Sequence, residues 1–189
     1  MASKQDPPTF VVERIDQLAE LTSPARLEIL DAACAAGPCT AAELGRLLGR
    51  APDSLYYHLR RLVRVELLAE EGGGPDGATY TAPARVIRMS TASSGPKYRA
   101  LMSKVMLATL RATQRDLTRS IDAGGRVGHE ADSDAGVGRV KGWLTSREQE
   151  KVNTHLRAIH EILHRSKPRP GARLFAIGYG FAAIEAIER

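Results

Sequence analysis

Two short apolar helices joined by a tight turn constrain the fold of this chain more than any other feature. Residues 40–43, TAAE, form a capping box in which Thr40 and Glu43 satisfy each other's backbone donors. This pattern predicts a helix that ends at Gly49. After the brief turn 49–51, Pro52 is typical of the first position of another helix. Apolar residues recur there at i, i+4 and i+7, which gives helix 52–65 one apolar face, made of Leu55, Leu59 and Leu62.

The flanking segments complete a recognisable order of elements. Helical spacing of apolar residues predicts a helix over Thr9–Leu21, and Ser23-Pro24 opens a second helix that ends at Gly37. After residue 65, a glycine-rich tip between two short runs of strand-forming residues predicts a hairpin that ends with Thr79–Thr81. Helix, helix, short helix, turn, helix and hairpin are the layout of a winged helix-turn-helix, which we predict over residues 9–83.

The C-terminal half predicts a different arrangement. Residues 84–96 are small and polar, which is typical of a linker, and a long helix is expected over Lys97–Ile121. A second capping box at 145–148 opens another helix, and strands are expected at Val140–Leu144 and Arg173–Ile184. The predicted fold is mainly α with small β: a winged helix-turn-helix domain, then an α+β C-terminal extension with a long helix. We expect residues 97–189 to serve dimerisation or to hold an effector.

Charge is distributed unevenly along the chain. The net charge of +5 permits a polyanionic partner. However, residues 1–95 hold 10 Lys and Arg against 12 Asp and Glu, whereas residues 96–189 hold 17 against 10. The predicted DNA-reading segment is nevertheless locally basic, since between residues 46 and 64 five arginines accompany a single acid, Asp53.

Helix 52–65 would turn its polar face into a DNA major groove, which is wide enough to admit an α-helix. Ser54, Tyr57 and Arg61 lie at i, i+3 and i+7, so they share one side and are expected to contact base edges or phosphates. Arg60 and Arg64 are expected to meet phosphates. Thr40 is expected to contact a phosphate. His58 is expected either to contact a phosphate or to brace the helix-turn-helix. Tyr56 is expected to contact a base or the DNA backbone, with packing against the wing as the alternative.

Residues Leu21–Pro83 resemble the ArsR-like (arsenic-repressor-type) winged-helix regulators. The resemblance rests on four short sequence motifs: LTSPARLEIL from Leu21, TAAEL from Thr40, YHLRRL from Tyr57 and the pair Leu67-Leu68. It implies a homodimer on a palindromic operator, with the dimer built by Thr9–Leu21 and by the helix after the wing. Relatives that sense metals carry paired cysteines in the helix that begins near Thr40. That helix has none here, so no metal is expected, and a wing that carries Glu70 and Glu71 is not expected to grip DNA strongly.

Other classes of function find little support in the residues. No nucleophile elbow, phosphate-binding glycine loop or HExxH motif is present, so neither an enzyme nor a cofactor is predicted. The start of the chain lacks a signal-peptide pattern and no apolar run could cross a bilayer, so we expect a cytoplasmic protein without a membrane partner. Cys34 and Cys39 are interpreted as reduced, partly buried thiols, with a redox or metal pair as the alternative.

The sequence therefore predicts a homodimeric, sequence-specific transcriptional regulator that binds double-stranded DNA. The alternative is a ligand-sensing or protein-interaction module that kept the winged helix without binding DNA. The apolar side of helix 97–121 fits either a dimer interface or a cavity for a small-molecule effector. The basic side chains on another side of this helix fit either a solvated helix face or a contact with flanking DNA; they are Lys104, Arg111, Arg115 and Arg119.

Overall fold

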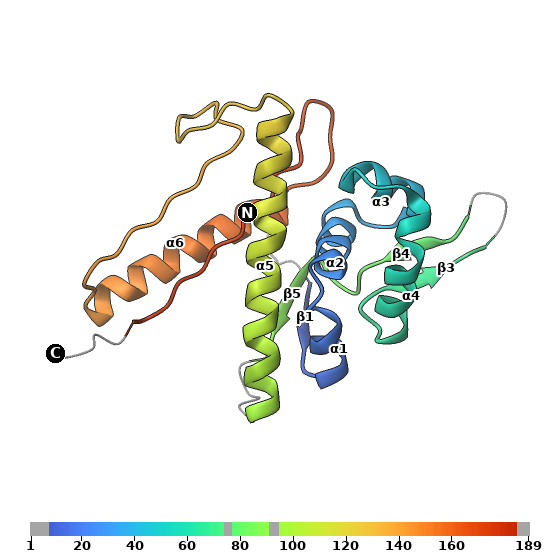
Figure 1. The fold of residues 1–189 in the computed structure, drawn as a ribbon, viewed down its shortest axis with the longest axis horizontal. Coiled ribbons are helices and arrows are strands. Elements are labelled where there is room, and N and C mark those ends of the chain that lie inside the picture. The colour runs from blue at the N-terminus through green and yellow to red at the C-terminus, as the bar shows by residue number, and fades with distance from the viewer. Residues whose placement is uncertain (1–7, 74–76, 91–94, 185–189) are drawn as a thin grey trace, which may run out of the picture.

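The computed structural model describes residues 8–73, 77–90 and 95–184 (Figure 1). In chain order the elements are β1 Thr9–Val12, α1 Ile15–Glu20, α2 Pro24–Ala36, β2 Cys39–Thr40, α3 Ala41–Leu48, the 3-10 helix η1 Pro52–Ser54, α4 Tyr56–Arg64, β3 Ala69–Glu71, β4 Thr79–Thr81, β5 Val86–Met89, α5 Pro96–Asp122 and α6 Ser146–Arg165. The predicted fold class is confirmed: a helix-turn-helix with small sheets is followed by a long helix. Within the described residues, no helix is long and apolar enough to span a membrane.

The helix-turn-helix forms as its capping signals predict. The Thr40 amide donates to Glu43 Oε2 at 2.8 Å, and the Glu43 amide donates to Thr40 Oγ1 at 3.2 Å, which fixes the start of α3. Helix α3 ends at Gly49, whose φ of 62° lies in the left-handed region that favours glycine. Leu55, Leu59 and Leu62 are fully buried, so the predicted apolar face of the following helix does pack into the core.

The predicted wing is confirmed as a β3–β4 hairpin and gains a third strand. The sheet has the order β2-β4-β3 and is antiparallel throughout, with Cys39 opposite Tyr80 and Glu70 also opposite Tyr80. Strand β2 was not predicted, because two residues carry no periodicity. Tyr80 is buried and its hydroxyl donates to Glu70 Oε1 at 3.1 Å, which links the two strands of the hairpin. The hairpin tip at 74–76 lies outside the described residues.

Two predictions at the edges of this domain are wrong. Residues 9–12 form strand β1 instead of the first turns of a helix, and only α1 at 15–20 is helical. Residues 86–89, predicted to belong to a linker, form β5, which pairs with β1 in parallel so that Thr9 faces Val86. The run Thr9–Val12 is rich in β-branched and aromatic residues, and a partner strand was enough to override its helical spacing.

The described part of the C-terminal half contains two helices and leaves many apolar side chains exposed. Helix α5 packs against α2 and α1, and α6 starts at the predicted capping box of Thr145 and Glu148. The strands predicted at 140–144 and 173–184 are wrong, since these segments have no regular structure and no partner strand among the described residues. Val140 and Trp143 are 93% and 92% exposed, so their apolar side chains pack against nothing described. In Figure 1, α6 lies across α5 from the winged helix.

Candidate nucleic-acid interface

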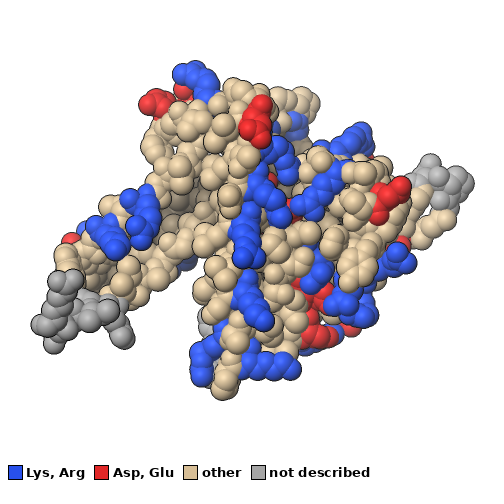
Figure 2. All heavy atoms as spheres, in the orientation of Figure 1, with Lys and Arg blue, Asp and Glu red and all other residues tan. Residues whose placement is uncertain are grey.

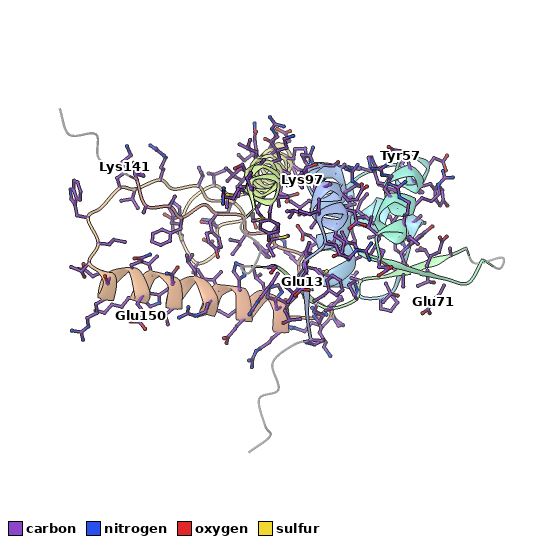
Figure 3. All side chains as sticks on the ribbon, turned by 90° about the horizontal axis from the view of Figure 1, so that it is seen from below. Glu13, Tyr57, Glu71, Lys97, Lys141 and Glu150 are labelled. Atoms are coloured by element: carbon purple, nitrogen blue, oxygen red, sulfur yellow. The ribbon has the colours of Figure 1, made fainter. Side chains whose placement is uncertain are left out.

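Helix α4 presents a polar face at the surface of the helix-turn-helix. Its opposite face is locked by Leu59 and Leu62, both without solvent exposure. On the outer side Tyr57 is 59% exposed and Tyr56 is 42% exposed, values that are high for aromatic rings. Figure 3 places Tyr57 at the periphery of the molecule, on the side opposite Glu71 of the wing. The helix therefore offers aromatic hydroxyls to a ligand outside the fold.

Ser54 and Arg60 lie on the same exposed surface as the tyrosines. The Ser54 hydroxyl donates to the Ala51 carbonyl at 2.6 Å, and Arg60 Nε donates to the Tyr56 carbonyl at 3.3 Å. Both contacts are local to the start of α4, so they orient the side chains without drawing them into the core. Of the residues predicted to contact DNA, these four are exposed in η1 and in the first five residues of α4.

Arg61 is held differently, because its guanidinium binds the carboxylate of Glu20. Arg61 Nη2 lies 2.6 Å from Glu20 Oε1, and Arg61 Nε lies 3.1 Å from Glu20 Oε2. The Glu20 side chain is only 5% exposed and also binds Arg26 Nε at 2.9 Å and Arg64 Nη2 at 3.4 Å. One buried carboxylate at the end of α1 thus joins arginines from α2 and α4. Both carboxylate oxygens of Glu20 bind arginines, and these ion pairs hold α4 at its angle to the domain.

A second buried carboxylate, Glu28 of α2, holds the turn between α3 and α4. It forms ion pairs with Arg50 of that turn and with Arg115 of α5, whose Nε lies 2.7 Å from Glu28 Oε1. Sequence reasoning missed both glutamates. The available signal was that Glu20 and Glu28 each interrupt an apolar stretch of helix in a domain with clustered arginines.

His58 lies half-buried behind Tyr57, with the two ring centroids 5.4 Å apart. Its Nδ1 is buried without a hydrogen-bond partner among the described residues. Burial, and then the charges of Arg26 and Arg50, lower the pKa of His58 below its ordinary value. The ring is therefore neutral at physiological pH, which fits the packing alternative better than attraction to a phosphate.

Thr40 is engaged in its own cap. Its hydroxyl and amide both contact the Glu43 carboxylate, and these hydrogen bonds lower the pKa of Glu43. A carboxylate that stays ionised at the start of α3 occupies the place where a phosphate would meet the helix dipole. The wing is also electronegative, since Glu70 and Glu71 are exposed and no Lys or Arg occurs from 69 to 84.

The Cys39 side chain is buried and that of Cys34 is half-buried. Burial raises the pKa of Cys34 to about 12 and that of Cys39 to about 11. Cys39 is part of strand β2, and its thiol faces the Tyr80 carbonyl at 3.8 Å. Protonated thiols are poor nucleophiles and poor metal ligands, so these features favour the interpretation of packed, reduced side chains over a redox or metal pair.

Comparison with protein families gives a match to the same elements. Residues 21–71 match a helix-turn-helix domain family. The match runs from the end of α1 to the end of β3, so it includes α3, the turn and α4. Comparisons with curated proteins and with solved structures found no match. Helix-turn-helix domains of this kind belong to DNA-binding transcriptional regulators, and that class is indicated for this chain.

Proposed function

We propose that this chain is a sequence-specific transcriptional regulator that inserts α4 into the major groove of double-stranded DNA. The observation that carries the proposal is the exposed polar face of α4, set on a helix whose other face is buried and whose angle is held by Glu20. In this arrangement Ser54, Tyr56 and Tyr57 contact base edges, and Arg60 and Arg64 contact phosphates.

The remaining predicted contacts take supporting places in the proposal. Arg61 borders the groove while its charge is shared with Glu20, so its main effect is to position α4. His58 packs behind Tyr57 as a neutral ring. Thr40 caps the start of α3, and the neighbouring Glu43 carboxylate disfavours a phosphate there. The proposed DNA-binding part spans 9–83, extended by the pairing of β5 with β1.

We further propose a homodimer in the manner of the ArsR-like regulators, built by residues 97–189. Its support is the apolar surface that α5 leaves uncovered, formed by Met106, Leu107, Leu110 and Ile121. Large apolar residues gathered on one helix face are typical of an interface between subunits. A two-fold dimer would place two copies of α4 on half-sites about one or two helical turns apart, roughly 10–20 base pairs. We place such a regulator in the cytoplasm.

The decisive experiment is to sequence the genomic DNA fragments that the purified protein retains, and then to repeat the selection with Tyr57→Ala. We expect a palindromic motif from the parent protein. The variant should lose about 1–3 kcal/mol of discrimination at one position in each half-site, because a base contact is removed without disturbing the core.

Tyr179→Ala is the matched control, since this tyrosine is similarly exposed but lies far along the chain from α4. It should return the parent motif. Retention of random fragments only, with no enriched motif, would contradict sequence-specific binding, and an unchanged motif from Tyr57→Ala would remove Tyr57 from the base-contacting set.

A further inference from the structure

Helix α5 has three distinct sides. One side, which includes Val105, Ala108 and Ala112, is buried against the winged helix. A second side carries the uncovered apolar residues Met106 and Leu110. Helical periodicity places a third side next to the buried one and away from the uncovered apolar residues, and there Lys97, Lys104 and Arg111 recur every seven residues and are all exposed. We call these three residues the basic stripe.

The basic stripe has no counter-charge of its own. No hydrogen bond or ion pair is found for Lys97, Lys104 or Arg111 within 8–73, 77–90 and 95–184. From Pro96 to Arg115 the helix contains five basic residues and no acidic one. A solvated helix face normally alternates the two signs, because Glu–Lys pairs at i, i+4 support the helix. A stripe of one sign along about 21 Å of helix indicates a polyanionic partner.

The stripe is continuous with the helix-turn-helix at its upper end. An open groove of about 660 Å³ lies between the end of α3 and α5, and its lining includes Gly49, Arg50, Arg111, Arg115 and Arg119. Arg119 Nη1 also reaches the Leu47 carbonyl of α3 at 3.5 Å. The basic surface of α5 therefore reaches the turn that precedes α4 along this groove.

The stripe and α4 face the same way. Figure 2 shows a line of Lys and Arg side chains along the length of α5, on the face of the molecule that also carries α4. In the perpendicular view, Tyr57 and Lys97 lie in the upper part of the picture, whereas Glu13 and Glu71 lie in the lower part (Figure 3). One rigid ligand on this face could contact both helices at once.

We propose that the basic stripe of α5 binds the phosphate backbone of the same DNA duplex whose major groove receives α4. Duplex DNA carries about one negative charge per 1.7 Å of its axis, so a helix of this length meets several phosphates. These contacts strengthen binding without reading sequence, because phosphates are alike at every base pair. The inference rests on the proposed DNA binding by α4 and adds a second contact surface to it.

The test compares the parent protein with Lys97→Gln/Lys104→Gln/Arg111→Gln on two duplexes, one carrying the selected motif and one of random sequence. Affinity is measured by fluorescence anisotropy over a series of KCl concentrations. Each lost phosphate contact lowers the slope of log K against log [salt] by about 0.9. We expect the slope to fall by about 2–3 on both duplexes, with the selected motif unchanged.

The matched control is Lys141→Gln/Arg147→Gln/Lys151→Gln, which removes the same charge from exposed positions outside α5. Its slope should equal that of the parent protein, and an equal fall in both triple variants would overturn the proposal in favour of a net-charge effect. An unchanged slope in the stripe variant, while Tyr57→Ala still loses discrimination, would overturn the stripe alone. If the parent protein binds neither duplex, the proposed function fails as well.

Calorimetric titration with inorganic phosphate distinguishes a small-anion site from a backbone contact. Saturable binding of phosphate to the parent protein, lost in the stripe variant while the DNA slope stays unchanged, would assign the groove to a small anion and overturn the proposal. Thermal unfolding of both triple variants should match the parent protein, because all six positions are exposed.

Discussion

At the scale of residues, the recognition surface depends on a side chain that does not belong to it. Glu20 is buried at the end of α1 and binds arginines from α2 and α4, so it fixes the helix that would enter DNA. A buried carboxylate is tolerated only when it is paired, and here one acid is surrounded by three cations. One carboxylate cannot neutralise three cations, so positive charge remains at the surface of α4, chiefly at Arg64, whose side chain is 63% exposed.

Replacing Glu20 with Gln should lower the free energy of unfolding by about 2–3 kcal/mol. The amide cannot balance Arg26 and Arg61, although the partial exposure of Arg61 reduces the cost below that of a fully buried pair. Urea unfolding followed by circular dichroism measures the change. Glu13→Gln is the control, because Glu13 is exposed, and equal stability of the two variants would show that Glu20 does not brace the domain.

At the scale of elements, the turn between α3 and η1 is set by a close approach of two backbones. The Arg50 amide donates to the Gly45 carbonyl at 2.8 Å, which folds the chain back against α3. A Cβ on Gly45 would lie 2.7 Å from the Arg50 carbonyl oxygen, closer than such atoms pack. The angle between α3 and α4 thus requires glycine inside a helix, where its own propensity is poor.

We expect Gly45→Ala to destabilise the protein by about 1–3 kcal/mol, despite the better helix propensity of alanine, since the turn must open to admit the methyl group. The free energy of DNA binding should fall by more than the free energy of unfolding, because α4 moves with the turn. Gly142→Ala, at a position with open space around it, serves as the control for thermal unfolding and for DNA binding. A Gly45→Ala variant as stable as this control would disprove the steric requirement.

At the scale of the whole molecule, apolar side chains are well buried in the winged helix and poorly buried in the C-terminal half. None of the residues of α6 is buried, and exposed apolar side chains continue through Leu174, Phe175 and Ile177. A stable interface covers roughly 800 Å² on each partner, and we propose that the apolar residues of α5 and these C-terminal side chains contribute to it. The uncovered apolar side of α5 and the C-terminal segment thus support the proposed dimer, whereas the proposed DNA contacts lie on α4 and on the basic stripe of α5.

Leu110→Glu should weaken the proposed dimer by at least about tenfold, because it places a charge at the centre of the uncovered face of α5. Sedimentation equilibrium at several protein concentrations measures the change. Ala42→Glu adds the same charge at an exposed position on α3 and should leave the dimer intact. A parent protein that remains monomeric at high concentration would contradict the homodimer itself.

The local elements of the helix-turn-helix could be predicted because their signals are local. Capping boxes at Thr40 and Thr145 begin helices where expected, and the leucines of α4 are buried as their spacing indicates. The strands β1 and β5 could not be predicted in this way, since each exists only through its pairing with the other. The strands expected at 140–144 and 173–184 fail for the same reason, because no partner strand lies beside them among the described residues.

The sequence by itself determined which helix offers a polar face and where the turn before it lies, since capping, glycine and leucine spacing act over a few residues. Only the tertiary structure decided that Arg61 pairs with Glu20, that the His58 ring is half-buried and neutral, and that the basic stripe of α5 shares a face with α4. These outcomes depend on which segments meet in space. Burial and ion pairing join residues that lie far apart along the chain, and no local pattern records them.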